Sequence, residues 1–159
     1  MTGQSAHECG VMVNYGFYKH QNRLSPNQNT LAKELRANGY QTVYFGKSHL
    51  GRPLAELGFD LDRSDDKTLV DDDAARELGI EHVPPVLRRD YLAADAAVEY
   101  LRNYEPGDQP LAMVFSTNLP HPPFFAEEKF KHLYPADEMA LPQSFHVESF
   151  AGKPAFQEA

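Results

Sequence analysis

The pattern of apolar and polar positions predicts a helix followed by a strand at two places in the chain. Residues 40–45 are rich in β-branched and aromatic side chains and are bracketed by glycines, as a core strand usually is. Before them, residues 31–38 have Asn29 or Thr30 as an N-cap and Gly39 directly after their end, which are helix boundary signals. The first unit is therefore a helix, a strand and then a polar loop.

The second unit repeats this order. Residues 90–104 form the clearest predicted helix, because apolar side chains recur at helical spacing after Asp90, which can serve as the N-cap. Residues 111–116 are a continuous apolar run, as expected of a strand buried on both faces, and the polar loop 117–123 follows them. Two such units predict an α/β fold with a mostly parallel sheet and crossover helices, so both polar loops should lie at the same edge of one sheet.

The rest of the chain gives weaker signals. Residues 1–29 are predicted to be rich in loops, and residues 127–134 to form a short helix. Residues 52–89 are interpreted as a long, solvated and mobile connection, because their aspartates lack the regular spacing and glycine turn of a calcium-binding loop. Besides Asp60 of the segment 58–60, these aspartates are Asp62, Asp65, Asp66, Asp71, Asp72 and Asp73. We expect a single domain over residues 1–159, with residues 136–159 loosely ordered.

Composition excludes several classes of function. The chain has 159 residues and a hydrophobic fraction of 42%, which suits one domain with its own core. A net charge of −8 without any basic run argues against a nucleic-acid surface, and no apolar run approaches the length of a membrane span. Cys9 is the only cysteine, so an internal disulfide cannot form. No signal peptide is recognised, and cytoplasmic, periplasmic and secreted locations all stay open.

Basic side chains follow both predicted strands. Lys47 and His49 are two positions apart after the first strand, so in extended chain they point the same way, and His121 follows the second strand. Ligands of open α/β sheets bind at the carboxyl ends of the strands. A fixed ammonium group and imidazoles at that edge predict a site for an oxyanion, which an acidic protein can bind only through such a local basic cluster.

Four stretches, in order along the chain, resemble motifs of the sulfatase family. The longest, residues 30–51, is similar to the family pattern T-L-A-x-x-L-x-x-x-G-Y-x-T-x-x-x-G-K-W-H-L-G, with Ser48 in place of the usual Trp. Residues 1–11 resemble the L-T-G…H-x-x-G-V run, residues 58–60 the G-F-D motif, and residues 118–124 the P-H-x-P-F loop. Four ordered matches make chance agreement far less probable than one short motif would.

The resemblance implies an alkaline-phosphatase-like fold and metal-dependent hydrolysis of sulfuric esters through a formylglycine nucleophile, with calcium or magnesium as the divalent metal. By this resemblance, Lys47 corresponds to the lysine that contacts the sulfate group and His49 to the histidine beside the formylglycine. His121 corresponds to the histidine near the leaving oxygen, a candidate general acid that also binds substrate. His7 is a weaker candidate for substrate binding.

Other parts of the family's machinery have no counterpart in this sequence. The paired aspartates and the formylglycine motif C/S-x-P-x-R would lie before Met1, and the later Asp-Asn or Asp-His metal ligands after Ala159. Cys9 lacks the Pro and Arg of that motif, so we interpret it as a small, at least partly buried thiol. We therefore expect this chain to be the middle part of a sulfatase catalytic domain. The metal ligands of that domain are missing from this chain, and we expect the chain to hydrolyse nothing alone.

Three functions stay open on the sequence. The first is the sulfatase fragment, acting on a small-molecule sulfate ester. The second is a phosphonate monoester or phosphodiester hydrolase of the same superfamily, because both substrates are tetrahedral anions and Lys47, His49 and His121 cannot separate them. The third is a non-catalytic remnant that binds an anion or a partner. In any of these, exposed sheet edges would favour self-association.

Overall fold

The structure is a computed structural model, and its described residues are 1–13, 23–64, 71–107, 109–122, 124–146 and 152. They divide into two compact units, Met1–Phe125 and Ala126–Ala159, and each is described by itself. All the predicted site residues lie in the first unit.

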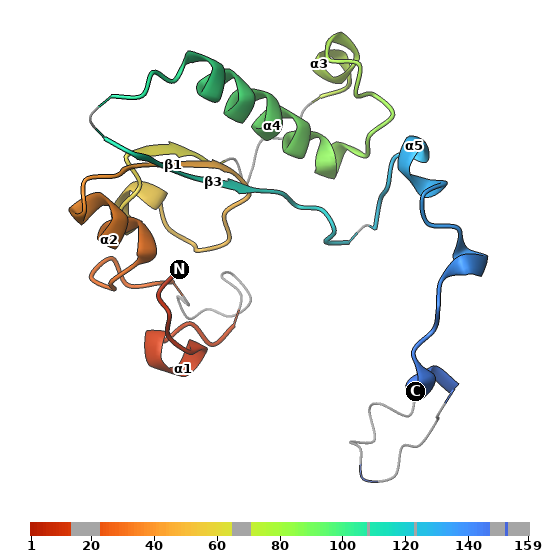
Figure 1. Cartoon of the computed structure of the whole chain (residues 1–159), viewed down its shortest axis with the longest axis horizontal. Helices are drawn as coiled ribbons and strands as arrows, with labels where there is room; N and C mark the ends of the chain where they lie inside the picture. The colour runs from red at the N-terminus through yellow and green to blue at the C-terminus, as the bar shows by residue number, and fades with distance from the viewer. Residues whose placement is uncertain (14–22, 65–70, 108, 123, 147–151, 153–159) are drawn as a thin grey trace. The chain divides into compact units, whose positions relative to one another are not determined.

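A three-stranded parallel sheet forms the centre of the first unit (Figure 1). The strand order is β2-β1-β3, with β1 (Gln41–Gly46) between β2 (Leu61–Arg63) and β3 (Leu111–Ser116). In the β1–β3 register Gln41 pairs with Leu111 and Gly46 with Ser116, so the two strands end side by side. The predicted α/β fold with a parallel sheet is confirmed.

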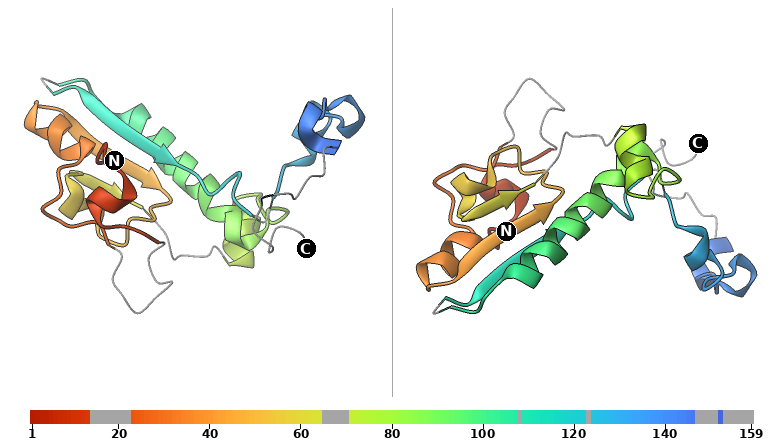
Figure 2. Two further views of the ribbon diagram at one scale, coloured as in Figure 1. Left: turned by 90° about the horizontal axis from the view of Figure 1, so that it is seen from below. Right: turned by 90° about the horizontal axis from the view of Figure 1, so that it is seen from above.

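Helices cover both faces of this sheet. Side chains of a strand alternate between faces, so Tyr44 packs in the cluster of α2 (Leu31–Ala37), while Val43 and Phe45 pack with Ala97 of α4 (Pro85–Asn103). Figure 1 shows α4 and α2 on opposite sides of the sheet, and the two views of Figure 2 show α4 lying lengthwise along it. The crossover from β2 to β3 thus places α4 against β1 and β3.

The first helix is bounded as the sequence predicts. Thr30 is the N-cap, because its side chain accepts a hydrogen bond from the backbone N–H of Lys33 (3.2 Å). The same hydroxyl donates to the carbonyl of Leu57 at 2.5 Å, which ties the helix start to the chain beyond β1. Gly39 follows the helix with a φ of 85°, a left-handed conformation that suits glycine.

The connection predicted over residues 52–89 is not simply a mobile loop. It contains the 3₁₀ helix η1 (Leu54–Leu57), β2, α3 (Asp72–Glu77) and the first turns of α4. Several of its aspartates hold local structure: the Asp62 carboxylate accepts the backbone N–H of Leu54 at 2.9 Å, and Asp71 caps α3 through the N–H of Ala74 at 2.8 Å. These elements are too short to show a period in the sequence. Asp65 and Asp66 lie outside the described residues.

Two further predictions for the second helix–strand unit are wrong. The helix begins at Pro85, not at Asp90, because Pro84 and Pro85 supply the dihedral angles that a first turn accepts. Asp90 therefore lies inside α4 rather than capping it. β3 is not buried on both faces, because none of its side chains is fully buried and its Phe115 is 46% exposed.

The remaining elements are short. Residues 6–9 form α1 (Ala6–Cys9), closed by a capping box between Ser5 and Glu8. The second unit holds α5 (Glu128–Lys131), within the predicted 127–134 helix, and the 3₁₀ helices η2 (Ala136–Glu138) and η3 (Gln143–His146). Of the tail predicted to be loosely ordered, residues 136–159, residues 147–151 and 153–159 lie outside the described residues. None of the helices in the described part of the chain is long and apolar enough to cross a membrane.

Candidate active site

The carboxyl ends of β1 and β3 are pressed together, and this contact fixes where Lys47 leaves the sheet. The backbone N–H of Lys47 donates to the carbonyl of Ser116 at 2.9 Å. Gly46 has a φ of 89°, and a Cβ atom at this position would stand 2.0 Å from the Ser116 carbonyl oxygen. Only glycine permits both the conformation and the close approach. On its other side, the Lys47 carbonyl accepts the hydroxyl of Tyr44 at 2.6 Å.

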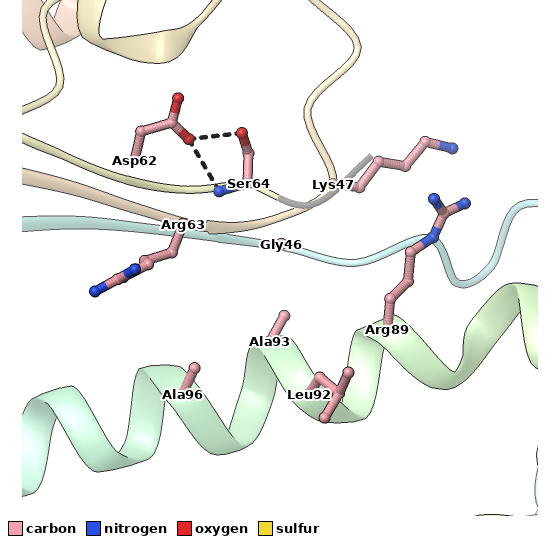
Figure 3. A pocket seen from close by; sticks show the side chains of 9 residues that line it. All are labelled: Gly46, Lys47, Asp62, Arg63, Ser64, Arg89, Leu92, Ala93 and Ala96. Carbon is pink, nitrogen blue, oxygen red and sulfur yellow. Dashed lines mark hydrogen bonds between the residues drawn. The ribbon is translucent and has the colours of Figure 1, made fainter. Parts of the chain in front are cut away.

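A pocket of about 430 Å³ opens between the strand ends and α4 (Figure 3). Its lining consists of Gly46, Lys47, Asp62, Arg63, Ser64, Arg89, Leu92, Ala93 and Ala96. Three of these side chains are cations and one is a carboxylate, so the lining carries a net positive charge. This local excess contrasts with the net charge of −8 of the whole chain.

The one carboxylate of this lining already serves the fold. Asp62 accepts hydrogen bonds from the backbone N–H and the hydroxyl of Ser64, at 2.9 and 2.6 Å, and from the N–H of Leu54 at 2.9 Å. Figure 3 shows Asp62 turned toward Ser64, while Lys47 and Arg89 extend from the strand end and from the helix. The carboxylate therefore holds the strand end in place, and Lys47 lines a pocket in which cations outnumber carboxylates.

A buried carboxylate fastens the loop after β3 to α4. Asp90, 6% exposed, accepts the backbone N–H of Asn118 with both oxygens (2.8 and 2.9 Å) and the N–H of Leu119 at 3.0 Å. The Asn118 side chain adds a bond from Nδ2 to the same carboxylate at 2.8 Å. Its Oδ1 accepts a bond from the guanidinium of Arg89 at 3.3 Å. The loop that carries His121 thus starts from a fixed position on the helix.

A second buried group fixes the start of α4. Arg88 donates to the carbonyls of Val83 and Glu81, at 2.9 and 3.2 Å, and pairs with Asp72 at 2.7 Å. The Arg88 side chain is 5% exposed, whereas that of Asp72 is 73% exposed. The hydrogen bond and charge of Arg88 lower the pKa of the Asp72 carboxyl below its usual value. Because Arg89 follows directly, this anchoring also fixes where Arg89 leaves the helix.

The structure separates the predicted site residues into one that lines the pocket and three that are exposed. Lys47 is half-buried and lines the pocket. His49 and His121 are exposed on the loops after β1 and β3, at the same edge of the sheet, and Nδ1 of His121 lies 2.8 Å from the carbonyl of Pro122. His7 is exposed in α1. The described lining of the pocket includes Lys47 and no histidine.

Sequence reasoning missed Arg89, Asp90 and Asn118 as residues of this region. The signal was present, because Arg88, Arg89 and Asp90 form a charged triplet at the start of an otherwise amphipathic helix. Asn118 opens the loop directly after the second strand, at the edge where ligands bind. Their pairing could not be read from the sequence, because Asp90 and Asn118 are 28 positions apart.

The described residues do not offer a metal centre. Within the described ranges, no three His, Cys, Asp or Glu side chains converge on a point that could hold a metal ion. Cys9 is only partly buried, and its Sγ donates a weak hydrogen bond to the carbonyl of Ala6 at 3.6 Å.

Comparison with known proteins identifies the class of this domain: the chain belongs to the sulfatase family, whose model, described as Sulfatase, matches residues 1–145. The resemblance seen in the sequence is confirmed. No curated protein matches the chain.

A solved structure with the same fold is titled "Crystal structure of Ps i-CgsB in complex with k-i-k-neocarrahexaose". It aligns with a TM-score of 0.60 at 17% identity, over 88% of this chain and 37% of that one. At this identity the likeness shows the fold alone, and it confirms the alkaline-phosphatase-like α/β fold. The chain spans little more than a third of that structure's length.

Proposed function

We propose that this chain is part of the catalytic domain of a hydrolase of sulfuric esters and that it supplies the side of the active site that binds the sulfate group. Membership of the sulfatase family supports the class of reaction. The observation that carries the proposal is the position of Lys47, which lines a net positive pocket at the carboxyl end of β1. A fixed ammonium group there stabilises the negative charge on the sulfate oxygens as the ester bond breaks.

The exposed histidines take the remaining roles in this proposal. His121 is the general acid that protonates the leaving oxygen and also contacts substrate, while His49 lies beside the nucleophile. Their support is the sheet geometry, because the loops after β1 and β3 start at paired residues of adjacent parallel strands. His7 is the weakest candidate for contact with the substrate, because it lies in α1, far from these strand ends in the sequence.

The isolated chain does not supply every group that the reaction needs. The reaction of the family also needs a nucleophile and a divalent metal, calcium or magnesium, which activates that nucleophile and binds sulfate oxygens. The sequence has no C/S-x-P-x-R motif, and the described residues have no cluster of metal ligands. We therefore propose that the isolated chain binds the anion without hydrolysing the ester.

Two other functions are compatible with the same pocket. A phosphonate monoester or phosphodiester hydrolase would present the same tetrahedral anion to Lys47. A non-catalytic protein that binds an anion or a partner is favoured for this chain by the missing metal ligands among its described residues. Binding constants for sulfate and methylphosphonate, measured side by side, separate the first alternative.

The decisive experiment is a titration of the full chain with sodium sulfate, at constant ionic strength against chloride, by isothermal titration calorimetry. Replacing Lys47 by alanine should weaken sulfate binding about tenfold or more, because a hydrogen bond to a charged group contributes about 1.5–3 kcal/mol. Lys131→Ala is the matched control, since Lys131 is an exposed lysine of the second unit that pairs with Glu128. Equal affinity of the Lys47→Ala variant and the unmodified chain would contradict the proposal. Turnover of an aryl sulfate above the Lys47→Ala level would refute the inactivity of the isolated chain.

A further inference from the structure

We propose that Arg89 is a second sulfate-binding residue of the Lys47 pocket and that Asn118 aims its guanidinium. This inference rests on the proposed function, since it adds a residue to the same anion site. Arg89 is half-buried near the start of α4 and lines the pocket together with Lys47. Figure 3 shows the ammonium group of Lys47 and the guanidinium of Arg89 extending to the same side of the pocket, one from the strand end and one from the helix.

The orientation of the Asn118 amide follows from its partner. The Asp90 carboxylate accepts hydrogen bonds, so it requires the Nδ2 donor of Asn118 to face it, and the two atoms lie 2.8 Å apart. Because Nδ2 faces the carboxylate, Oδ1 of the amide points the other way. It accepts a hydrogen bond from the Arg89 guanidinium at 3.3 Å. Both Asp90 and Asn118 are 6% exposed, so water has little access to the bond between them. A buried carboxylate thus helps, through one amide, to position the Arg89 guanidinium.

Arginine and lysine would contribute differently to binding the anion. A guanidinium presents its N–H donors as a planar fork that matches two oxygens of one tetrahedral anion, whereas an ammonium acts as a compact point charge. An anion held by both is fixed in orientation as well as in place. The pair therefore suits a tetrahedral oxyanion that turns at least two non-bridging oxygens toward the pocket. A sulfate ester has three such oxygens, which share its single negative charge.

The other arginine of the lining provides an internal comparison. Figure 3 shows Arg63 extending from β2 away from Lys47 and Arg89. Arg63 also lines a second pocket, which contains the acidic residues Glu99 and Glu105. Arg63 thus also borders a pocket with acidic residues, and the sulfate site is assigned to Lys47 and Arg89.

The test uses the full chain with sodium sulfate as the probe. Arg89→Gln should weaken sulfate binding about tenfold or more, and Arg89→Lys should recover part of the loss, because the charge returns without the fork. Arg102→Gln is the matched control, an exposed arginine in the last turn of the same helix, and should leave the affinity unchanged. Asn118→Ala should weaken binding less than Arg89→Gln does, because the guanidinium remains but is no longer aimed.

A second measurement separates binding from a purely structural role. In the unmodified chain, the NMR signals of the Arg89 guanidinium should shift on addition of sulfate while those of Arg102 stay in place. If Lys47→Ala weakens sulfate binding but Arg89→Gln does not, the role of Arg89 is refuted and the proposed function stands. If the unmodified chain binds no sulfate, or Lys47→Ala changes nothing, the proposed function fails and this inference with it. Should Arg89→Gln not fold, the guanidinium signals decide, and signals that do not respond to sulfate overturn the inference.

Discussion

Asp90 of α4 and Asn118 of the loop after β3 are both buried and are joined through the backbone N–H of Asn118, at 2.8 and 2.9 Å, and through its side-chain Nδ2, at 2.8 Å. The contact closes the second helix–strand unit at the end where the basic loops lie. It also gives Asp90 a tertiary role instead of the helix-capping role that its sequence position suggests.

Removing this carboxylate should destabilise the chain strongly. Asp90→Ala leaves the N–H groups of Asn118 and Leu119 and the Asn118 amide without their acceptor, at a cost of about 2–4 kcal/mol in the free energy of unfolding. Urea unfolding measures this cost, with Asp95→Ala, an exposed aspartate of the same helix, as the control. A loss no larger than that of Asp95→Ala would show that the contact does not stabilise the fold.

The paired ends of β1 and β3 predict that Gly46 tolerates no side chain. Gly46→Ala combines an unfavourable φ of 89° with a Cβ placed 2.0 Å from the Ser116 carbonyl, so we expect a loss of about 2–4 kcal/mol or failure to fold. Gly39→Ala has a similar φ of 85° with nothing within 4 Å, and should lose only about 1 kcal/mol. Thermal unfolding of the two variants compares them directly. Equal losses would mean that the contact with Ser116 relaxes at no cost.

The Arg88–Asp72 pair predicts a pH-dependent contribution to stability. The folded pKa of Asp72 is lowered from 3.8, first by its hydrogen bond to Arg88 and then by the charge of Arg88. The stability it contributes is therefore present above about pH 3.8 and is lost as the pH falls through the lower folded pKa. Urea unfolding of the chain and of Asp72→Asn is compared between pH 6 and 2.5. The difference between their free energies of unfolding should disappear only at the acidic end. A difference in free energy of unfolding that stays constant with pH would refute this account.

The exposed edge of β3 predicts self-association. β3 has β1 on one side only within the described sheet, and its Phe115 is 46% exposed, so an unpaired strand edge carries apolar surface. Sedimentation velocity should show a mass that grows with concentration, and Phe115→Lys should shift the chain toward monomer. Phe124→Lys is the control, because Phe124 is 84% exposed but lies outside the sheet. Equal behaviour of the two variants would place the association elsewhere on the chain.

Local signals predicted much of the first helix–strand unit. The Thr30 cap, the left-handed Gly39 and the apolar run of β1 each act over a few residues, so they can be read from neighbouring positions alone. The connection over residues 52–89 was misread for the opposite reason. Its elements are short, and aspartates such as Asp62 and Asp71 find backbone partners only once the chain is folded.

The sequence by itself determined the family, the parallel α/β fold and the place of Lys47 after β1, because motif order and hydrophobic runs are properties of the linear chain. Only the tertiary structure decided which side chains share the pocket with Lys47. Arg89 reaches it from a helix that starts earlier than its apolar pattern indicates, and Asn118 and Asp90 meet across 28 positions. Such contacts depend on how the crossover helix lies on the sheet, which no local pattern specifies.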